Sequence, residues 1–286
     1  MATHQHQDHH SAAGTDDMAM AELLDLDAEV LHSYLSELTA WIGGFAADPA
    51  PRRILDLGSG TGTGTFALLE RFVQADATAL DISAPLLHHL RNKADELGMA
   101  DRVRTIQADL DATWPDIAPV DLVWASASLH HMADPDRMLT SVFAALRPGG
   151  LLVAVEMDSF PRFLPEDLGI GRPGLEARCH AAMAEEHAVH VPHLGSDWGP
   201  RLIVAGFTIE AERTFAVDLT PPLPASAARY AQASLRRLRS GLKDRLSAGD
   251  LAALDALLDG DGPEGILRRG DLHVRTARTV WVARRP

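Results

Sequence analysis

Glycines at every second position follow an aliphatic run that contains Asp56. The stretch ILDLGSGTGTGTFALL, residues 54–69, has the spacing D-x-G-x-G-x-G, with a fourth glycine at position 64. Glycine lets a chain turn sharply and bring its amide groups against a ligand with no Cβ in the way. The stretch therefore predicts a ligand-binding turn between a strand and a helix. Its candidate ligand contacts are Asp56, Gly58, Ser59, Gly60 and Gly62.

The same spacing limits the kind of ligand. A dinucleotide fingerprint requires G-x-G-x-x-G, and Thr63 or Thr65 stands where its third glycine belongs. A phosphate-binding loop requires G-K-[ST], which is also missing. An acid inside the turn would repel a pyrophosphate but could accept a hydrogen bond from an ammonium group. We therefore expect a ligand that carries a cation, and a nucleotide-dependent oxidoreductase is disfavoured.

Two adjacent histidines are candidates for proton transfer. His130 and His131 follow the fourth aliphatic run of the chain. An imidazole near its ordinary pKa suits the deprotonation of a hydroxyl or an amine. His130 is the candidate general base. The alternative is that the pair forms a structural turn before the helix that begins near Asp134.

The elements around these residues predict a doubly wound α/β domain. Short aliphatic runs alternate with helical patterns, which indicates a parallel sheet covered on both faces, with its ligand at the carboxyl ends of the strands. Two later segments alternate like an antiparallel pair, which completes a seven-stranded, mostly parallel Rossmann-like sheet. The expected strands are 52–57, 76–82, 102–108, 120–125, 151–157, 207–215 and 275–285, and the expected helices of the core are 62–73, 84–97 and 134–146. We expect RPGG, residues 147–150, to end the helix before the fifth strand.

The rest of the chain is expected to surround this domain. Residues 1–16 are polar and histidine-rich and predict a disordered leader. Residues 17–50 have an amphipathic pattern that predicts one or two helices. The Rossmann-like domain is expected over 51–215 and 271–286, with a helical cap inserted over 216–270. A further helical pattern spans 174–205 and is broken near Pro192.

Composition excludes several partners. The chain has 286 residues and a formal charge of −14, which would repel a nucleic acid. No stretch approaches the roughly 18 apolar residues of a membrane helix, and the single Cys179 fits a reducing compartment. We expect a soluble, cytoplasmic protein that binds neither nucleic acid nor membrane and acts on a small molecule. The sequence leaves open whether it forms a homodimer.

The motifs together resemble those of the class I S-adenosylmethionine-dependent methyltransferases, over about residues 50–157. ILDLGSGTG is similar to their first motif, ALDIS (79–83) to the motif of the second strand, and QADLD (107–111) to the motif of the third. DLVWASASLHHMADPDRML and LRPGGLLVAVE resemble the fourth and fifth motifs of the branch that includes quinone-biosynthesis enzymes. The resemblance implies methyl transfer to oxygen, nitrogen or carbon of a small acceptor, driven mainly by alignment.

The resemblance also implies the cofactor contacts. Asp81 takes the place of the acid that holds the ribose hydroxyls, and Asp109 the place of the acid that binds the adenine amino group. S-adenosylmethionine is thus the expected cofactor and S-adenosylhomocysteine the product. A non-catalytic protein that binds this cofactor is the alternative. The full expected set is Asp56, Gly58, Ser59, Gly60, Gly62, Asp81, Ile82, Asp109, Leu110, Ala125 and Ser126.

Substrate contacts are expected after the fifth strand, where the family usually builds its substrate-binding parts. The candidates there, with the histidine after the fourth strand, are His131, His187, His190, His193 and Trp198. We expect no metal, because Pro192 interrupts the helix that would align the three later histidines and because Ala125 and Ser126 replace the acid of metal-dependent relatives. Cys179 and Glu156 are interpreted as structural, with Glu156 also a candidate to line the pocket.

Overall fold

One mixed sheet lies at the centre of the computed structural model, which describes residues 5–46, 49–259 and 262–286, with side chains from residue 17 onward. Within these residues the strand order is β3-β2-β1-β4-β5-β7-β6, and β7 alone runs antiparallel to its neighbours. The strands are β1 (Arg53–Leu57), β2 (Asp76–Asp81), β3 (Val103–Gln107), β4 (Val120–Ser126), β5 (Leu146–Met157), β6 (Thr208–Leu219) and β7 (Val274–Arg284). The predicted doubly wound, mostly parallel sheet is confirmed.

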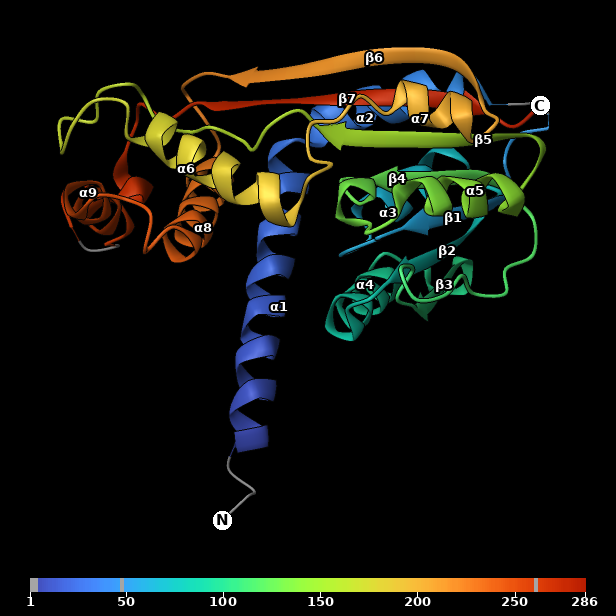
Figure 1. The fold of residues 1–286 in the computed structure, drawn as a ribbon, viewed down its shortest axis with the longest axis horizontal. Helices are drawn as coiled ribbons and strands as arrows, with labels where there is room; N and C mark the ends of the chain where they lie inside the picture. The colour runs from blue at the N-terminus through green and yellow to red at the C-terminus, as the bar shows by residue number, and fades with distance from the viewer. Residues whose placement is uncertain (1–4, 47–48, 260–261) are drawn as a thin grey trace.

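Helices cover both faces of the sheet (Figure 1). In β4, Leu122 and Trp124 pack on the face that also receives α2 and α3, whereas Val123 and Ala125 pack with α5 and α7 on the other. Burial on both sides explains why this strand reads as a continuous aliphatic run. The helices are α1 (Gln5–Val30), α2 (His32–Gly43), α3 (Thr63–Arg71), α4 (Ala84–Glu96), α5 (Pro135–Ala145), α6 (Leu175–His190), α7 (Gly199–Val204), α8 (Ala225–Gly241) and α9 (Ala248–Leu258), with single 3₁₀ turns η1 (Ala100–Arg102), η2 (Leu129–His131) and η3 (Ile266–Arg268).

Two element boundaries differ from those expected. RPGG belongs to β5, which begins at Leu146 and shifts its register against β4 between Val120 and Leu122. The helix before it already ends at Ala145. β6 continues to Leu219, so the inserted segment starts later than residue 216. Both extensions are set by pairing with a neighbouring strand, which the local sequence does not show.

The N-terminal region also differs from expectation. α1 begins at Gln5, so residues 5–16 of the expected disordered leader are helical, while residues 1–4 lie outside the described part of the chain. Once the packed second half of a helix has formed, each added residue gains a hydrogen bond without a new nucleation cost. The helix can therefore continue into a polar segment that no apolar pattern marks.

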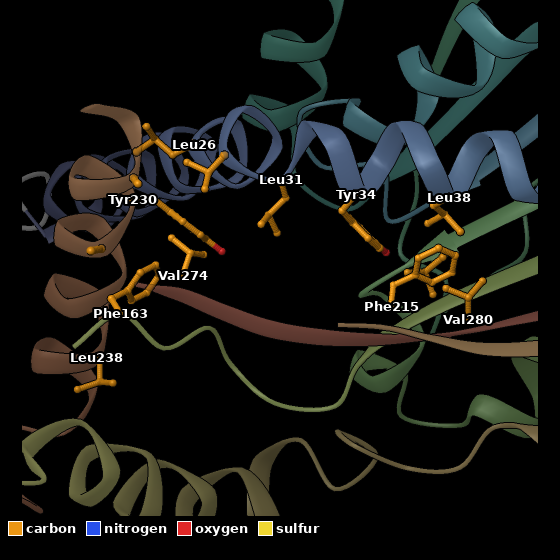
Figure 2. Packing of buried hydrophobic residues seen from close by; sticks show 14 of the residues in the cluster. Leu26, Leu31, Tyr34, Leu38, Phe163, Phe215, Tyr230, Leu238, Val274 and Val280 are labelled. Atoms are coloured by element: carbon orange, nitrogen blue, oxygen red, sulfur yellow. The ribbon is translucent and has the colours of Figure 1, made fainter. Parts of the chain in front are cut away.

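The N-terminal helices, the cap and the sheet share one hydrophobic core (Figure 2). Tyr34 of α2 packs edge-on against Phe215 of β6, with ring centroids 5.6 Å apart. Tyr230 of α8 packs in the same way against Phe163, at 5.0 Å. Leu26 and its neighbours on α1 lie in the same cluster. α1 and the cap are thus held to the domain by burial of apolar surface.

None of the described helices is long and apolar enough to cross a bilayer.

Candidate functional site

The glycine turn lies where the strand order reverses. β2 and β3 follow β1 on one side, while β4 and β5 lie on the other, so the carboxyl ends of β1 and β4 face the crevice where α/β sheets bind ligands. Gly58, Gly60 and Gly62 have φ angles of +65°, +53° and +84°, which favour glycine. A Cβ on Gly58 would stand 2.6 Å from Cβ of Ser128, so this turn also needs glycine for space. Gly64 instead lies inside α3 against Trp124.

Asp56 points into the protein, toward α3. Its residue is 2% exposed, and its Oδ2 accepts a hydrogen bond of 2.5 Å from the Thr65 hydroxyl on α3. Burial, with a smaller contribution from the charge of Asp81, raises the pKa of Asp56 to about 7. The carboxyl group therefore fixes α3 to the end of β1, and its expected contact with an ammonium group stays a prediction.

Asp81 joins the turn to the end of β2. Its Oδ2 accepts the Gly60 amide at 2.8 Å, and its Oδ1 accepts the Ser83 amide at 2.9 Å. Each oxygen of an ionised carboxylate has a second lone pair, so Asp81 can accept two further hydrogen bonds. Ile82, next along the chain, is 64% exposed and offers an apolar surface beside the carboxylate. This pair suits a ligand with two hydroxyls beside a flat apolar ring.

Asp109 follows β3 at the same edge of the sheet. It is exposed, and its Oδ1 accepts the amides of Asp111 and Ala112 at 3.0 and 3.3 Å, which fixes its orientation. Leu110 is buried, and its carbonyl accepts a hydrogen bond from Arg137. The turn after β3 is therefore rigid and presents one carboxylate to solvent.

The end of β4 carries an unusual backbone conformation that sequence reasoning missed. Ala125 is fully buried and Ser126 half-buried, and Ala127 then has a φ of +51°. A residue other than glycine in this region is strained, and such strain gathers at functional sites. The amide of Ala127 donates to the carbonyl of Val155 at 2.8 Å, which holds the bend in place.

Hydroxyl groups without partners surround the glycine turn. Ser59, Thr63 and Ser128 have buried hydroxyls with no hydrogen-bond partner among the described residues. Buried polar groups in native proteins are nearly always paired, and each unpaired one needs an explanation. A cradle that a Cβ would fill, lined by unpaired hydroxyls, fits a polar ligand such as the amino-acid end of S-adenosylmethionine.

His130 is held by a carboxylate. Its residue is 3% exposed, and its Nδ1 hydrogen-bonds Oε2 of Glu156, which is 2% exposed and lies at the end of β5. Oε1 of Glu156 also accepts the amide of Leu129 at 2.9 Å. An ionised carboxylate can only accept, so Nδ1 carries the proton and Nε2 is left to act as an acceptor. Glu156 is thus a positioning residue, which the sequence hinted at only as an acid ending an aliphatic run.

His131 and His187 lie beside this pair. The ring of His131 lies 4.2 Å from that of His130, and the ring of His187, on α6, lies 5.0 Å from that of Phe160. Desolvation of its ring is the main cause that lowers the pKa of His131 to about 4, and the positive charge of Arg237 adds to it. Desolvation also lowers the pKa of His187. Both imidazoles are therefore neutral near pH 7 and can line a site without competing for the proton.

The remaining substrate candidates do not gather at this point. Trp198 is fully buried in the core with α5 and α7, and its substrate contact stays a prediction. His193 lies against that ring, with centroids 6.4 Å apart, and His190 is exposed at the end of α6. In the described ranges, no three His, Cys, Asp or Glu residues are placed to hold a metal ion.

α1 lies directly over the glycine turn. A Cβ on Gly60 would stand 2.9 Å from Cδ1 of Leu24, and Asp25 binds His89 and Lys93 of α4 at 2.7 and 3.0 Å. Arg278 of β7 donates to Asp27 on the same helix at 2.6 Å. The sequence did not predict these contacts because they join segments that are far apart in the chain.

Comparison with known proteins identifies the part of the chain that carries this geometry. Residues 55–152 match a family model described as a methyltransferase domain. The chain is 40% identical over 109 residues to a trans-aconitate 2-methyltransferase of Acidovorax sp. (strain JS42), covering 38% of this chain and 39% of that protein. It is 36% identical over 118 residues to a demethylmenaquinone methyltransferase of Thermus thermophilus, covering 41% and 52%.

Among solved structures, the fold is similar to that of a Bacillus halodurans C-125 protein assigned as a methyltransferase. The TM-score is 0.54 at 17% identity, over 88% of this chain and 98% of that one. The curated relatives match over about half of their own length or less. The residues matched by the family model run from β1 into β5.

Proposed function

We propose that this chain, whose residues 55–152 match a methyltransferase domain, is a class I S-adenosylmethionine-dependent methyltransferase that transfers the methyl group of that cofactor to a small-molecule acceptor. The observation that carries the proposal is the glycine turn at the switch point of the sheet, tied by its Gly60 amide to Asp81. The relatives named for trans-aconitate and demethylmenaquinone support a small acceptor.

The residues at the turn divide the binding of the cofactor among them. Asp81 would hold the ribose hydroxyls, Asp109 the adenine amino group, and Ile82 and Leu110 the faces of the adenine ring. The turn from Gly58 to Gly62 and the hydroxyls of Ser59 and Ser128 would hold the amino-acid end. When bound, the cofactor supplies a methyl group that its sulfonium has already activated. Alignment of two reactants alone can lower a barrier by roughly 7–11 kcal/mol.

His130 would take the proton of the acceptor. Glu156 holds Nδ1–H, so Nε2 keeps a lone pair for a hydroxyl or an amine. The carboxylate also stabilises the imidazolium that forms when the proton arrives. His131 and His187 would line the acceptor site in their neutral forms. The strained bend at Ala127 holds the residues after β4 in position for this step.

Two measurements on the purified protein test the proposal. Calorimetry with S-adenosylhomocysteine should show saturable binding, and NAD should show none. Incubation with methyl-labelled S-adenosylmethionine and a metabolite extract should move label into a small molecule. Absence of binding to both the cofactor and its product would refute the proposal. Binding without transfer to any acceptor would instead fit the non-catalytic cofactor-binding protein.

A further inference from the structure

A buried polar cluster joins α1, α2, α8 and β7 beside the glycine turn. Nη2 of Arg278 and the hydroxyl of Tyr230 both donate to Oδ1 of Asp27, each at 2.6 Å. The guanidinium carbon of Arg278 also lies 5.3 Å from the ring centroid of Tyr34. Thr276 lies two residues before Arg278 on β7 and so points to the same face of the sheet. Four polar side chains from four elements thus meet in an otherwise apolar core, and Thr276 lies on the same face of the sheet.

Three hydrogen-bond donors in this cluster have nothing to donate to. Nε of Arg278, the hydroxyl of Tyr34 and the hydroxyl of Thr276 are buried and have no hydrogen-bond partner within 3.5 Å in the described ranges, although Arg278 lies close enough to the Tyr34 hydroxyl to affect its pKa. Tyr34 and Thr276 are each 7% exposed. Burial raises the pKa of Tyr34 to about 12, so its hydroxyl keeps its proton. A buried donor left unpaired costs about 1–3 kcal/mol, so three such donors on one face of the sheet call for an acceptor atom.

The cluster lies within reach of the proposed site of methyl transfer. Asp27 follows Leu24 by less than one turn of α1, and Leu24 covers Gly60. Within the sheet, Ser126 pairs with Val155, and Arg278 pairs with Met157 on the same strand. Two strand spacings, roughly 10 Å, therefore separate Arg278 from the residues that follow β4. A small molecule bound at Arg278 can therefore reach the residues that follow β4.

The charge of the cluster decides which kind of hydrogen-bond acceptor it can bind. Asp27 already balances Arg278, and a second carboxylate would be buried beside the first, which is unfavourable for like charges. Apolar side chains lie around the two tyrosines of the cluster: Phe215 packs against Tyr34, and Leu31 and Val274 belong to the same hydrophobic cluster (Figure 2). An uncharged carbonyl oxygen on an apolar frame can accept hydrogen bonds from two of these donors without adding charge.

We propose that Arg278, Tyr34 and Thr276 form a subsite for an uncharged carbonyl oxygen of the methyl acceptor. The inference rests on the proposed methyl transfer and narrows its acceptors to apolar molecules with a ketone-type or quinone-type oxygen. Asp27 is the fixed counter-ion of the subsite, and Tyr230 holds that counter-ion in place. The subsite orients the methyl acceptor, while His130 takes the proton from the atom that receives the methyl group.

Matched probes and matched variants test the subsite. Acetophenone and benzoate share a shape but differ in charge, as do acetylcyclohexane and cyclohexanecarboxylate. Each is titrated into the protein saturated with S-adenosylhomocysteine. The variants Tyr34→Phe and Thr276→Val remove a hydroxyl and keep the shape. Thr140→Val is the control, since that hydroxyl donates to a carbonyl of its own helix, α5.

We expect at least one ketone to bind about 10-fold more tightly than its carboxylate. Tyr34→Phe and Thr276→Val should each weaken binding of the ketone about 5- to 10-fold. Both variants should keep the affinity for S-adenosylhomocysteine and have an unchanged or higher unfolding temperature. Thr140→Val should change none of these. Tighter binding of the carboxylates, no ketone binding, or variants that bind the ketone as well as the wild type would each overturn the subsite. Failure to bind S-adenosylhomocysteine would instead count against the proposed function itself.

Discussion

Asp56 is a carboxyl group that folding removes from water, and its effect on stability should depend on pH. Its pKa rises to about 7 in the folded protein, against 3.8 when unperturbed. The folded protein therefore holds this proton more tightly than the unfolded chain, so its stabilising effect is lost as pH rises through about 7. We expect Asp56 to lower the free energy of unfolding by about 2–3 kcal/mol between about pH 5 and pH 8.

Denaturant unfolding of the wild type and of Asp56→Asn at both pH values measures this effect. The asparagine keeps an oxygen for the Thr65 hydroxyl but cannot ionise. The free energy of unfolding should therefore fall less in the variant than in the wild type between about pH 5 and pH 8, by about 2–3 kcal/mol. Equal losses in the two proteins would show that Asp56 does not titrate in this range.

Glu156 should control which nitrogen of His130 carries the proton. Glu156→Gln keeps an oxygen for the Leu129 amide, but its NH₂ group cannot accept from Nδ1–H. Nitrogen-15 chemical shifts should show the imidazole proton moving from Nδ1 to Nε2. Methyl transfer should fall about 100-fold, as expected for loss of a positioned base, and its pH profile should change. Glu210→Gln, on β6 and bonded to Arg284, is the control.

An unchanged tautomer with a large loss of activity would contradict this positioning role. So would a changed tautomer with full activity, since the proton on Nδ1 would then be irrelevant.

Residue types near the turn were predictable, but their partners were not. The sequence marked Asp56, Asp81 and His130 because each ends or follows an aliphatic run. It could not show that Thr65 binds Asp56, or that Glu156 binds His130, because these contacts depend on how β1, β4 and β5 are placed side by side. The burial of Trp198 was not predictable either, because an aromatic residue near histidines looks the same in sequence whether it is buried or exposed.

At the scale of elements, the glycine turn is the part least able to accept a side chain. Gly58→Ala would place a methyl group 2.6 Å from Cβ of Ser128 at a φ of +65°. We expect a loss of about 1–3 kcal/mol in the free energy of unfolding, by analogy with other strained positions, and at least 10-fold weaker binding of S-adenosylhomocysteine. Thermal unfolding and calorimetry measure the two effects.

Gly241→Ala is the matched control, because nothing lies within 4 Å of its Cβ position at the end of α8. It should leave binding unchanged and keep or raise stability. Weak binding in this control, or normal binding in Gly58→Ala, would show that the turn is not the binding element.

Most strands of the sheet could be predicted from the local sequence. The positions of the helices that cover the sheet could be predicted only in part. β1, β2 and β4 are short apolar runs between turns, and their ends agree with the predicted ones to within a residue or two. The start of β5 and the end of β6 depend on pairing with a neighbour, so they extend beyond the predicted limits. The path of α1 over Gly60 depends on long-range contacts through Leu24 and Asp25, which no local pattern contains.

For the whole molecule, ligand binding should be coupled to unfolding. A ligand that binds only the folded protein adds about 2.7 kcal/mol to the free energy of unfolding at 100 times its Kd. We expect S-adenosylhomocysteine at this excess to raise the unfolding temperature of the wild type. Asp81→Asn should reduce the increase at the same ligand concentration, and NAD should cause none. An equal increase in Asp81→Asn would place the ribose contact elsewhere.

The reversed direction of β7 decides where the molecule can be attached to a surface. β7 runs from the crevice edge of the sheet back to the opposite edge, where Gly149 donates to the carbonyl of Arg285. Residue 286 and the start of α1 are therefore well separated (Figure 1). A sensor chip or fluorescent reporter joined at residue 286 would leave the ligand entrance clear. Attachment at the N-terminus would instead place the surface or reporter next to α1, the helix that covers the glycine turn.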